Sequence, residues 1–267
     1  MAAEINLSRD QILRTLVEKL HSLPEMVALW EGGSAAFDRV YQWSDIDLMA
    51  VVEDDYVPQV FTAAEQVLTA LSPIDLIYEV PQPAWHGHHQ KFYRLSKAGE
   101  YVLIDLAVMK ASSSNRFLES ELHGEAKVYF DRQGIVIPPP LDWEDLRSKI
   151  EARLEQLPVT FDMFQSLVKK EIYRNHPIDA HAFYQSMTIR PLVELLRIKH
   201  TPARYQFGPR YLYYDLPQAA AQRLETLLYP RDLADLQQKH AQAVGWFAEI
   251  LASIQENGLS LPEGSSS

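Results

Sequence analysis

The 267-residue sequence has no cysteine, no excess of basic side chains and no long apolar run. Without cysteine it can form no disulfide, no thiolate zinc site and no cysteine nucleophile. Its 36 acidic and 25 basic side chains give a formal charge of −11, which argues against a nucleic-acid partner held by phosphate neutralisation. No apolar stretch reaches the roughly 18 residues of a membrane-spanning helix, so we expect no membrane partner.

The composition is that of a folded globular protein. Apolar residues make up 47% of the chain and charged residues 23%, which excludes disorder over most of the length. Residues 1–14 lack the basic flank and apolar stretch of a signal peptide, so we expect a cytoplasmic protein. At roughly 150 residues per domain, the length corresponds to nearly two domains. The oligomeric state leaves no mark on the sequence.

The first half interleaves short apolar strands with amphipathic helices. Ser8-Arg9-Asp10-Gln11 is a capping box, and it predicts a helix from there to about residue 20. Periodicity predicts a second helix at 61–71 and strands at 26–30, 47–52, 74–80, 91–95 and 101–109. This order is typical of an α+β unit, a mixed sheet with flanking helices, over residues 1–137.

The pattern changes at Pro138-Pro139-Pro140, which cannot continue a sheet ladder. Beyond it the periodicity predicts an all-helical bundle over residues 141–261. The expected helices are 143–157, 161–175, one capped by Asp179 and running to about 200 with a break at Pro191, 218–228 and 231–256. Pro262 to Ser267 are expected to form a frayed tail.

The most informative stretch is Gly32-Gly33-Ser34, followed after ten residues by Asp45-Ile46-Asp47 at the start of an apolar strand. The period of two in a strand places both carboxylates on one face. Two adjacent carboxylates repel each other, so their proximity is unfavourable without a cation between them, and magnesium prefers such oxygen ligands. Gly33 would let the backbone approach a phosphate, and Ser34 could donate its hydroxyl there.

A third carboxylate is expected from a neighbouring strand, and Asp105 is the candidate. It interrupts the apolar run from Tyr101 to Met109, where a lone acid is costly unless it is paired or binds a metal. The alternative is a salt bridge from Asp105 to Arg94 or Lys91. Two acids of the 74–80 strand, Asp75 and Glu79, are further candidates for the same role, and Glu79 also for a general base.

Together these residues resemble the nucleotidyltransferase superfamily of the DNA polymerase β type, and within it the aminoglycoside nucleotidyltransferases. The resemblance is specific in Gly33-Ser34 and Asp45-Ile46-Asp47, and looser in Asp105 and the helical second half. It implies that Asp45, Asp47 and Asp105 hold one or two magnesium ions, and that Gly33 and Ser34 bind the phosphates of a nucleoside triphosphate. Asp38 departs from the pattern, because the family usually has glycine four residues after the serine.

The resemblance implies metal-dependent transfer of a nucleoside monophosphate, with release of pyrophosphate, to a hydroxyl of a small molecule. We expect AMP from ATP, and the acidic character of the chain would suit a cationic acceptor such as an aminoglycoside-like antibiotic. The alternative is an antitoxin-like module that nucleotidylates or binds a partner protein. A nucleic-acid polymerase is disfavoured by the net charge of −11.

Two further segments carry chemistry-bearing side chains. Residues 169–210 hold eight bases and three acids, and Lys170 and Arg174, together with Arg190 and Arg197, would meet the triphosphate if they face the cleft. The alternative is surface ion pairing with Glu171 and Glu194. Residues 204–214 are rich in aromatics and bases, and would form either a ligand wall or packing of the bundle.

The sequence Trp85-His86-Gly87-His88-His89 could bind a transition metal, although no fourth ligand stands at a fixed spacing. A place at the mouth of the acceptor pocket, with Trp85 stacked on a substrate ring, is the hypothesis that we favour for this loop.

Overall fold

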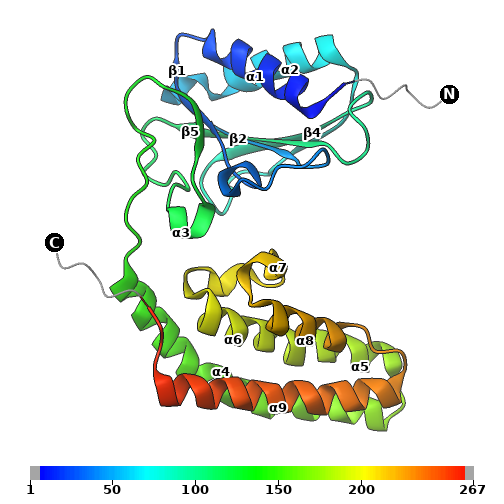
Figure 1. The fold of residues 1–267 in the computed structure, drawn as a ribbon. Coiled ribbons are helices and arrows are strands. Elements are labelled where there is room, and N and C mark those ends of the chain that lie inside the picture. The colour runs from blue at the N-terminus through cyan, green and yellow to red at the C-terminus, as the bar shows by residue number, and fades with distance from the viewer. Residues whose placement is uncertain (1–6, 262–267) are drawn as a thin grey trace. The chain divides into compact units, whose positions relative to one another are not determined.

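The computed structural model describes residues 7–261, and the chain divides into two units, residues 1–141 and 142–267 (Figure 1). The first is a six-stranded sheet with helices and the second is helical, which confirms the expected α+β class. The tail expected at Pro262–Ser267 lies outside the described residues. None of the described helices is both long enough and apolar enough to cross a lipid bilayer.

The first unit is built on one mixed sheet of order β3-β4-β5-β2-β1-β6. Only the central β2 and β5 pair in parallel, and the other neighbours are antiparallel. The elements are α1 (Arg9–His21), β1 (Met26–Glu31), η1 (Ala35–Phe37), β2 (Ile46–Val52), η2 (Asp54–Tyr56), α2 (Val57–Leu71), β3 (Ile74–Glu79), β4 (His89–Leu95), β5 (Leu103–Lys110), α3 (Ser120–His123) and β6 (Lys127–Asp131).

Helices α1 and α2 cover one face of this sheet (Figure 1). Ser8 caps α1 as expected, because its hydroxyl oxygen accepts a hydrogen bond from the backbone N–H of Gln11. The apolar stripe of α1 is buried against alternate residues of β2 and β5, of which Leu48 and Leu106 are fully buried. The intervening residues of β2 and β5 therefore point to the opposite face.

That opposite face is only partly covered. A smaller cluster around Trp30, Val51 and Met109 packs against Leu118, which lies in the segment between β5 and α3. The sequence pattern did not predict β6, an edge strand with exposed residues whose pairing with β1 shifts register between Leu29 and Trp30. The cluster does not extend to the end of this face where β2 and β5 begin. Polar residues, described below, occupy that end.

The second unit contains α4 (Trp143–Tyr173), α5 (Pro177–Phe183), η3 (Tyr184–Ile189), α6 (Arg190–His200), η4 (Pro202–Phe207), α7 (Leu212–Asp215), α8 (Gln218–Leu228) and α9 (Leu233–Asn257). The prediction of two helices over 143–175 was wrong, because α4 runs unbroken through Pro158. Proline removes one helical hydrogen bond. The buried stripe continues on both sides of Pro158, through Leu157 and Phe161, and this packing outweighs the lost bond.

The prediction that Asp179 caps a helix was also wrong. Helix α5 begins at Pro177 and passes into a π-helical segment, η3, before α6 starts with Pro191 in its first turn, where proline is tolerated. The side-chain amide of buried Gln165 donates to the carbonyl oxygen of Met187 in η3. Its amide oxygen accepts from Thr188 at 2.7 Å, so side-chain bonds support the irregular turn.

Candidate active site

Asp47 of β2 and Asp105 of β5 are direct partners in the parallel strand pair. Direct partners in neighbouring strands point to the same face, here the one opposite α1 and α2. Asp45 lies two residues before Asp47, and its Oδ1 accepts a hydrogen bond from the backbone N–H of Leu103 at 3.2 Å. The structure therefore brings together the three carboxylates that the sequence singled out, at the end where both strands begin.

The protein raises the pKa of two of these carboxyls. Burial raises the pKa of Asp105 to about 7, and the charges of Asp47 and Asp45 add to the effect. Burial also raises the pKa of Asp47 to about 6, with further contributions from Asp45 and Glu31. Both carboxyls therefore ionise less readily than an ordinary aspartate does. This donor set fits a divalent cation that prefers oxygen ligands.

Gln90 of β4 holds Asp105 in place, a role that no local sequence pattern indicated. Its side-chain amide donates to both carboxylate oxygens of Asp105, at 2.7 and 2.8 Å. The alternative salt bridges of Asp105 are absent from the described residues, because Arg94 pairs with Asp75 and Lys91 pairs with Glu65 and Glu79.

The same ion pairs show the surroundings of the two acids of β3. The structure gives Asp75 and Glu79 basic partners of their own, Arg94 and Lys91. Lys91 also reaches Glu65 of α2, on the face that the helices cover. Neither Asp75 nor Glu79 joins the three carboxylates, so their proposed roles as the third ligand are not supported.

The glycine turn touches the carboxylates directly. Gly33 has a φ of +53°, and a Cβ built on it would lie 1.9 Å from Oδ2 of Asp47. The preceding Gly32 donates its N–H to the carbonyl oxygen of Asp47 at 2.9 Å. Only glycine fits at position 33, because any side chain would displace Asp47 and would need an unfavourable backbone conformation.

Ser34 follows this turn and opens η1, a single 3₁₀ turn. Its Oγ is buried and has no hydrogen-bond partner among the described residues. A buried hydroxyl usually has a partner, so an unsatisfied one beside a glycine turn is available to an oxygen-rich ligand. The oxygen atoms of a phosphate group could accept a hydrogen bond from this hydroxyl.

The backbone conformation of Asp38 accounts for the usual preference for glycine at this position. It ends η1 with a φ of 52° and a ψ of 38°, the left-handed conformation that glycine adopts most readily. Aspartate tolerates this conformation better than most residues. Its side chain is exposed, and the turn closes through the N–H of Arg39, which donates to the carbonyl oxygen of Ser34 at 2.9 Å.

A buried ion pair fixes the start of β2. The Nε of Arg9 donates to the carbonyl oxygens of Ser44 and Asp45, both at 3.2 Å, and its Nη2 pairs with Glu31. Glu31 is fully buried and also accepts from the Tyr129 hydroxyl at 2.6 Å. We did not predict this group from the sequence, although Glu31 is an acid at the end of an otherwise apolar strand, next to Gly32-Gly33.

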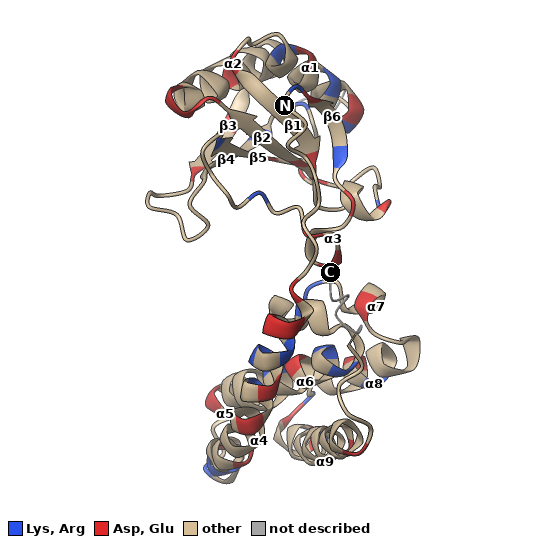
Figure 2. Cartoon of the chain, turned by 90° about the vertical axis from the view of Figure 1, so that its left-hand side faces the viewer, with Lys and Arg blue, Asp and Glu red and all other residues tan. Residues whose placement is uncertain are grey.

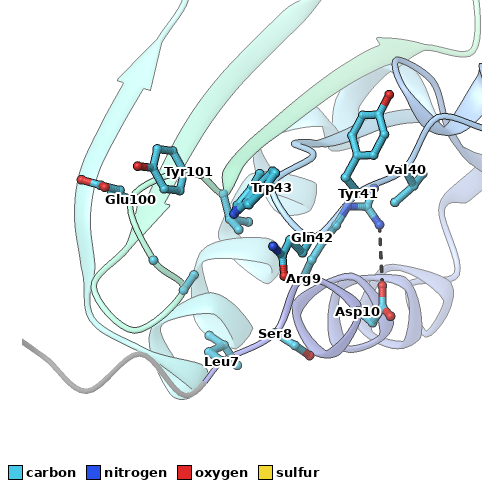
Figure 3. Close-up of a pocket in the computed structure, with 13 residues that line it drawn as sticks. Leu7, Ser8, Arg9, Asp10, Val40, Tyr41, Gln42, Trp43, Glu100 and Tyr101 are labelled. Carbon is cyan, nitrogen blue, oxygen red and sulfur yellow. Dashed lines mark ion pairs between the residues drawn. The ribbon is translucent and has the colours of Figure 1, made fainter.

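An open cavity of about 820 Å³ adjoins the start of β2 and β5 (Figure 3). Its walls include residues 40–43, which precede Asp45, and residues 98–102, which precede Leu103. The side chains of Trp43 and Tyr101 are 61% and 63% exposed, and Asp10 and Glu100 stand at the same cavity. This cavity offers aromatic surface and negative charge at the edge of the sheet where β2 and β5 begin, although none of the three carboxylates lines it.

The histidine loop forms an aromatic cluster. The rings of His86 and His88 stack at 5.6 Å, and His88 meets Phe117 edge-on at 5.3 Å. The one His and carboxylate group with metal-like spacing among the described residues lies elsewhere, at Glu171, His176 and Asp179. The structure thus gives no support to a transition metal in this loop. Trp85 is 91% exposed but does not line the cavity described above, so the structure gives no support to its stacking on a substrate ring there either.

The candidate phosphate binders of the second unit have different surroundings. Arg174 pairs with Glu171 at 2.7 Å, which is the surface ion pair considered as the alternative, while Lys170 is exposed. Arg197 is fully buried and bonded to Asp215, so the hypothesis that it meets a triphosphate was wrong. Both charge signs occur along α4 and α6 (Figure 2), as in the pair that Arg153 forms with Glu194 at 2.6 Å.

No protein-family model and no curated protein matches the sequence. The fold is distantly similar to that of nucleotidyltransferases. An aminoglycoside 6-adenyltransferase from Bacillus subtilis is 12% identical, with a TM-score of 0.38 over 94% of this chain and 91% of that one. Spectinomycin adenyltransferase from Enterococcus faecialis, solved with ATP and spectinomycin, is 11% identical, with a TM-score of 0.33 over 91% and 90%. At such identities the chemistry has to be argued from this chain's own residues.

The close approach of Gly33 to Asp47 predicts a specific effect of Gly33→Ala. The added Cβ displaces the Asp47 carboxylate and strains the turn, so we expect a loss of roughly 1–3 kcal/mol in the free energy of unfolding. Urea denaturation measures this loss. The matched control is Gly134→Ala, which shares a positive φ of +67° but meets nothing within 4 Å. Equal losses in the two variants would contradict the close packing of Gly33 on Asp47.

The raised pKa of Asp105 predicts that the metal-free protein loses stability as pH rises. An acid with a higher pKa in the folded than in the unfolded state favours folding most below its unfolded pKa, and this contribution is lost up to about pH 7. In EDTA, Asp105→Asn should therefore become more stable than the wild type as pH rises from 5 to 8, by on the order of 1 kcal/mol.

The control for this prediction is Asp75→Asn. Hydrogen bonding to Arg94 lowers the pKa of Asp75, so this substitution should not stabilise the protein at pH 8. Thermal unfolding of the three proteins across this pH range is the measurement. A wild type and an Asp105→Asn variant with parallel pH profiles would show that the carboxylates are not crowded.

Proposed function

We propose that the chain is a metal-dependent nucleotidyltransferase, which transfers a nucleoside monophosphate, AMP from ATP, to a hydroxyl group of a small molecule. The observation that carries the proposal is the pairing of Asp47 with Asp105 across β2 and β5, with Asp45 beside them. Among the described residues, Arg9 is the one basic side chain whose charge lowers the pKa of Asp47, and none lowers that of Asp105. Such a group is stabilised by a divalent cation.

In this proposal the carboxylates of Asp45, Asp47 and Asp105 hold magnesium, which would neutralise charge on the phosphates and on the leaving pyrophosphate. Gly33 lets the backbone approach the β- and γ-phosphates, and the buried Ser34 hydroxyl donates to them. The acceptor oxygen forms a bond to the α-phosphorus, the bond from that phosphorus to the bridging oxygen breaks, and the hydroxyl proton is released. Gln90 and Arg9 keep Asp105 and the start of β2 in place.

The cavity beside Asp45 is where we place the acceptor. Its aromatic side chains can stack on a ring, and Asp10 and Glu100 would attract positive charge (Figure 3). Arg9, the one basic side chain among the described residues that line the cavity, is paired with Glu31 and with Asp10. These features favour a cationic ring compound that carries hydroxyl groups, such as an aminoglycoside-like antibiotic.

The proposal predicts that Asp47→Asn abolishes turnover and leaves the fold intact. Turnover is measured as magnesium-dependent pyrophosphate release with the four nucleoside triphosphates and a panel of hydroxyl acceptors, and folding by circular dichroism. We expect a loss of at least about 10³-fold, because the variant removes a charge that acts on the transferring phosphate. Asp75→Asn, a carboxylate of the same sheet that pairs with Arg94, should keep wild-type turnover.

The midpoint temperature of thermal unfolding provides a second test, which needs no acceptor substrate. Magnesium with nucleoside triphosphate should raise it for the wild type and for Asp75→Asn, because a ligand that binds the folded state stabilises it. The rise should be lost in Asp47→Asn. An unchanged midpoint of the wild type at millimolar nucleotide, or equal turnover by Asp47→Asn and wild type, would refute the proposed site.

The placement of the acceptor predicts a separate effect of Trp43→Ala. Removal of the exposed ring should raise KM for the acceptor about tenfold, the value of one lost stacking contact, while KM for the triphosphate stays unchanged. Steady-state kinetics with an acceptor identified in the panel provide the measurement. Trp85→Ala, an exposed tryptophan outside this cavity, is the control, and an equal effect of both variants would place the acceptor elsewhere.

A further inference from the structure

The helical unit contains a cavity of its own, of about 670 Å³, which the proposed function does not use. Five segments line it: the end of α5, the π-helical segment η3, the first turn of α6, residues 206–213, and α8 with Tyr229 after it. Its volume lies within the range of small-molecule sites, roughly 300–1,000 Å³. The cavity therefore has the size of a site for a compact organic ligand.

A buried arginine keeps one wall of this cavity in a fixed shape. Arg197 is fully buried, and its guanidinium donates to the carbonyl oxygens of Gly208 at 2.8 Å and of Arg210. It also pairs with Asp215 at 2.8 Å, and the second oxygen of Asp215 is 2.8 Å from Arg204. These contacts tie residues 204–215 to α6, so the wall is formed before any ligand arrives.

The backbone around the cavity is irregular at two places. Tyr211, which lines it, has a φ of 60° and a ψ of 19°, a left-handed conformation that is unfavourable for a bulky residue. On the other side, η3 is a π-helical segment, and Gln185, Ser186 and Ile189 of this segment line the cavity. Strained conformations and π-helical turns are frequent at functional sites, and they persist only where other contacts hold them in place.

The lining has an apolar floor, an aromatic rim and one free positive charge. Buried Val193 and Leu224 form part of the floor, and the exposed rings of Tyr211 and Tyr229 stand at the rim. Arg190 lines the cavity, and its guanidinium has no ion pair or hydrogen bond among the described residues. Glu225, the acid of the lining, faces Tyr213 and raises the pKa of that hydroxyl.

We propose that this cavity binds a planar, largely apolar organic anion, an aromatic carboxylate or sulfonate whose charged group pairs with Arg190. The apolar floor and tyrosine rings would bury the flat part of the ligand, and the guanidinium would pair with the oxygens of its acid group. The proposal does not rest on the nucleotidyl transfer, because the two cavities belong to different units and share no residue.

The test uses the full-length chain and the fluorescent aromatic sulfonate 1-anilinonaphthalene-8-sulfonate, without nucleotide or magnesium. We expect saturable binding of one probe per chain. 1-Naphthoate should displace it at a concentration at least about tenfold lower than the neutral analogue 1-naphthalenemethanol requires, since the pairing with Arg190 needs a negative charge. Asp47→Asn should bind the probe like the wild type, which separates this site from the proposed active site.

Two variants locate the probe. Arg190→Gln, an exposed substitution, should weaken binding about tenfold, whereas Arg147→Gln, an arginine of α4 outside the cavity, should leave it unchanged. Ala221→Phe should fill the cavity and reduce the number of bound probes. Equal binding by Arg190→Gln and Arg147→Gln, no preference for naphthoate over the neutral analogue, or no saturable binding by the wild type would each overturn the proposal.

Discussion

The parallel pairing of β2 and β5 is the constraint on which the candidate active site depends. The chain leaves β2, passes through α2, β3 and β4, and returns as β5 in the same direction. Because both strands start at the same edge of the sheet, Asp47 and Asp105 become direct partners, although they are far apart in the sequence. An antiparallel return would have placed the start of one strand beside the end of the other, and the carboxylates would not meet.

This arrangement costs stability, and neighbouring residues hold it in place. Burial and mutual repulsion raise the pKa of Asp47 and Asp105, which means that their charged forms oppose folding. Gln90 fixes Asp105 by two hydrogen bonds, and Arg9 binds the carbonyl oxygens at the start of β2. A scaffold alone would not require such crowding, so the supporting bonds argue that the geometry of the carboxylates matters to function.

The sequence allowed prediction of those features that local pattern decides. Asp105 was identified because an acid interrupts an apolar strand, and Ser8 because a capping box is local. The roles of Gln90 and Arg9 depend on strand register and on helix docking, which no local pattern encodes. Local rules were also wrong where packing outweighs them. Helix α4 continues through Pro158 because its buried stripe continues on both sides. The sequence suggested Arg197 as a phosphate binder, but its side chain is fully buried.

Buried charges differ in how far the chain itself compensates them. This difference distinguishes a structural ion pair from a group that could bind a ligand. In the helical unit, buried Arg197 has Asp215 and backbone carbonyls as partners, all supplied by the chain, so this charge needs no ligand and shapes a wall. In the sheet unit, Glu31 is likewise matched by Arg9. Asp47 and Asp105 receive only partial compensation, from Gln90 and from Arg9, and their pKa values remain raised. A buried carboxylate that the chain compensates only in part is stabilised either by a proton or by a cation from outside, and this is the physical basis for our proposal of a cation at the three carboxylates.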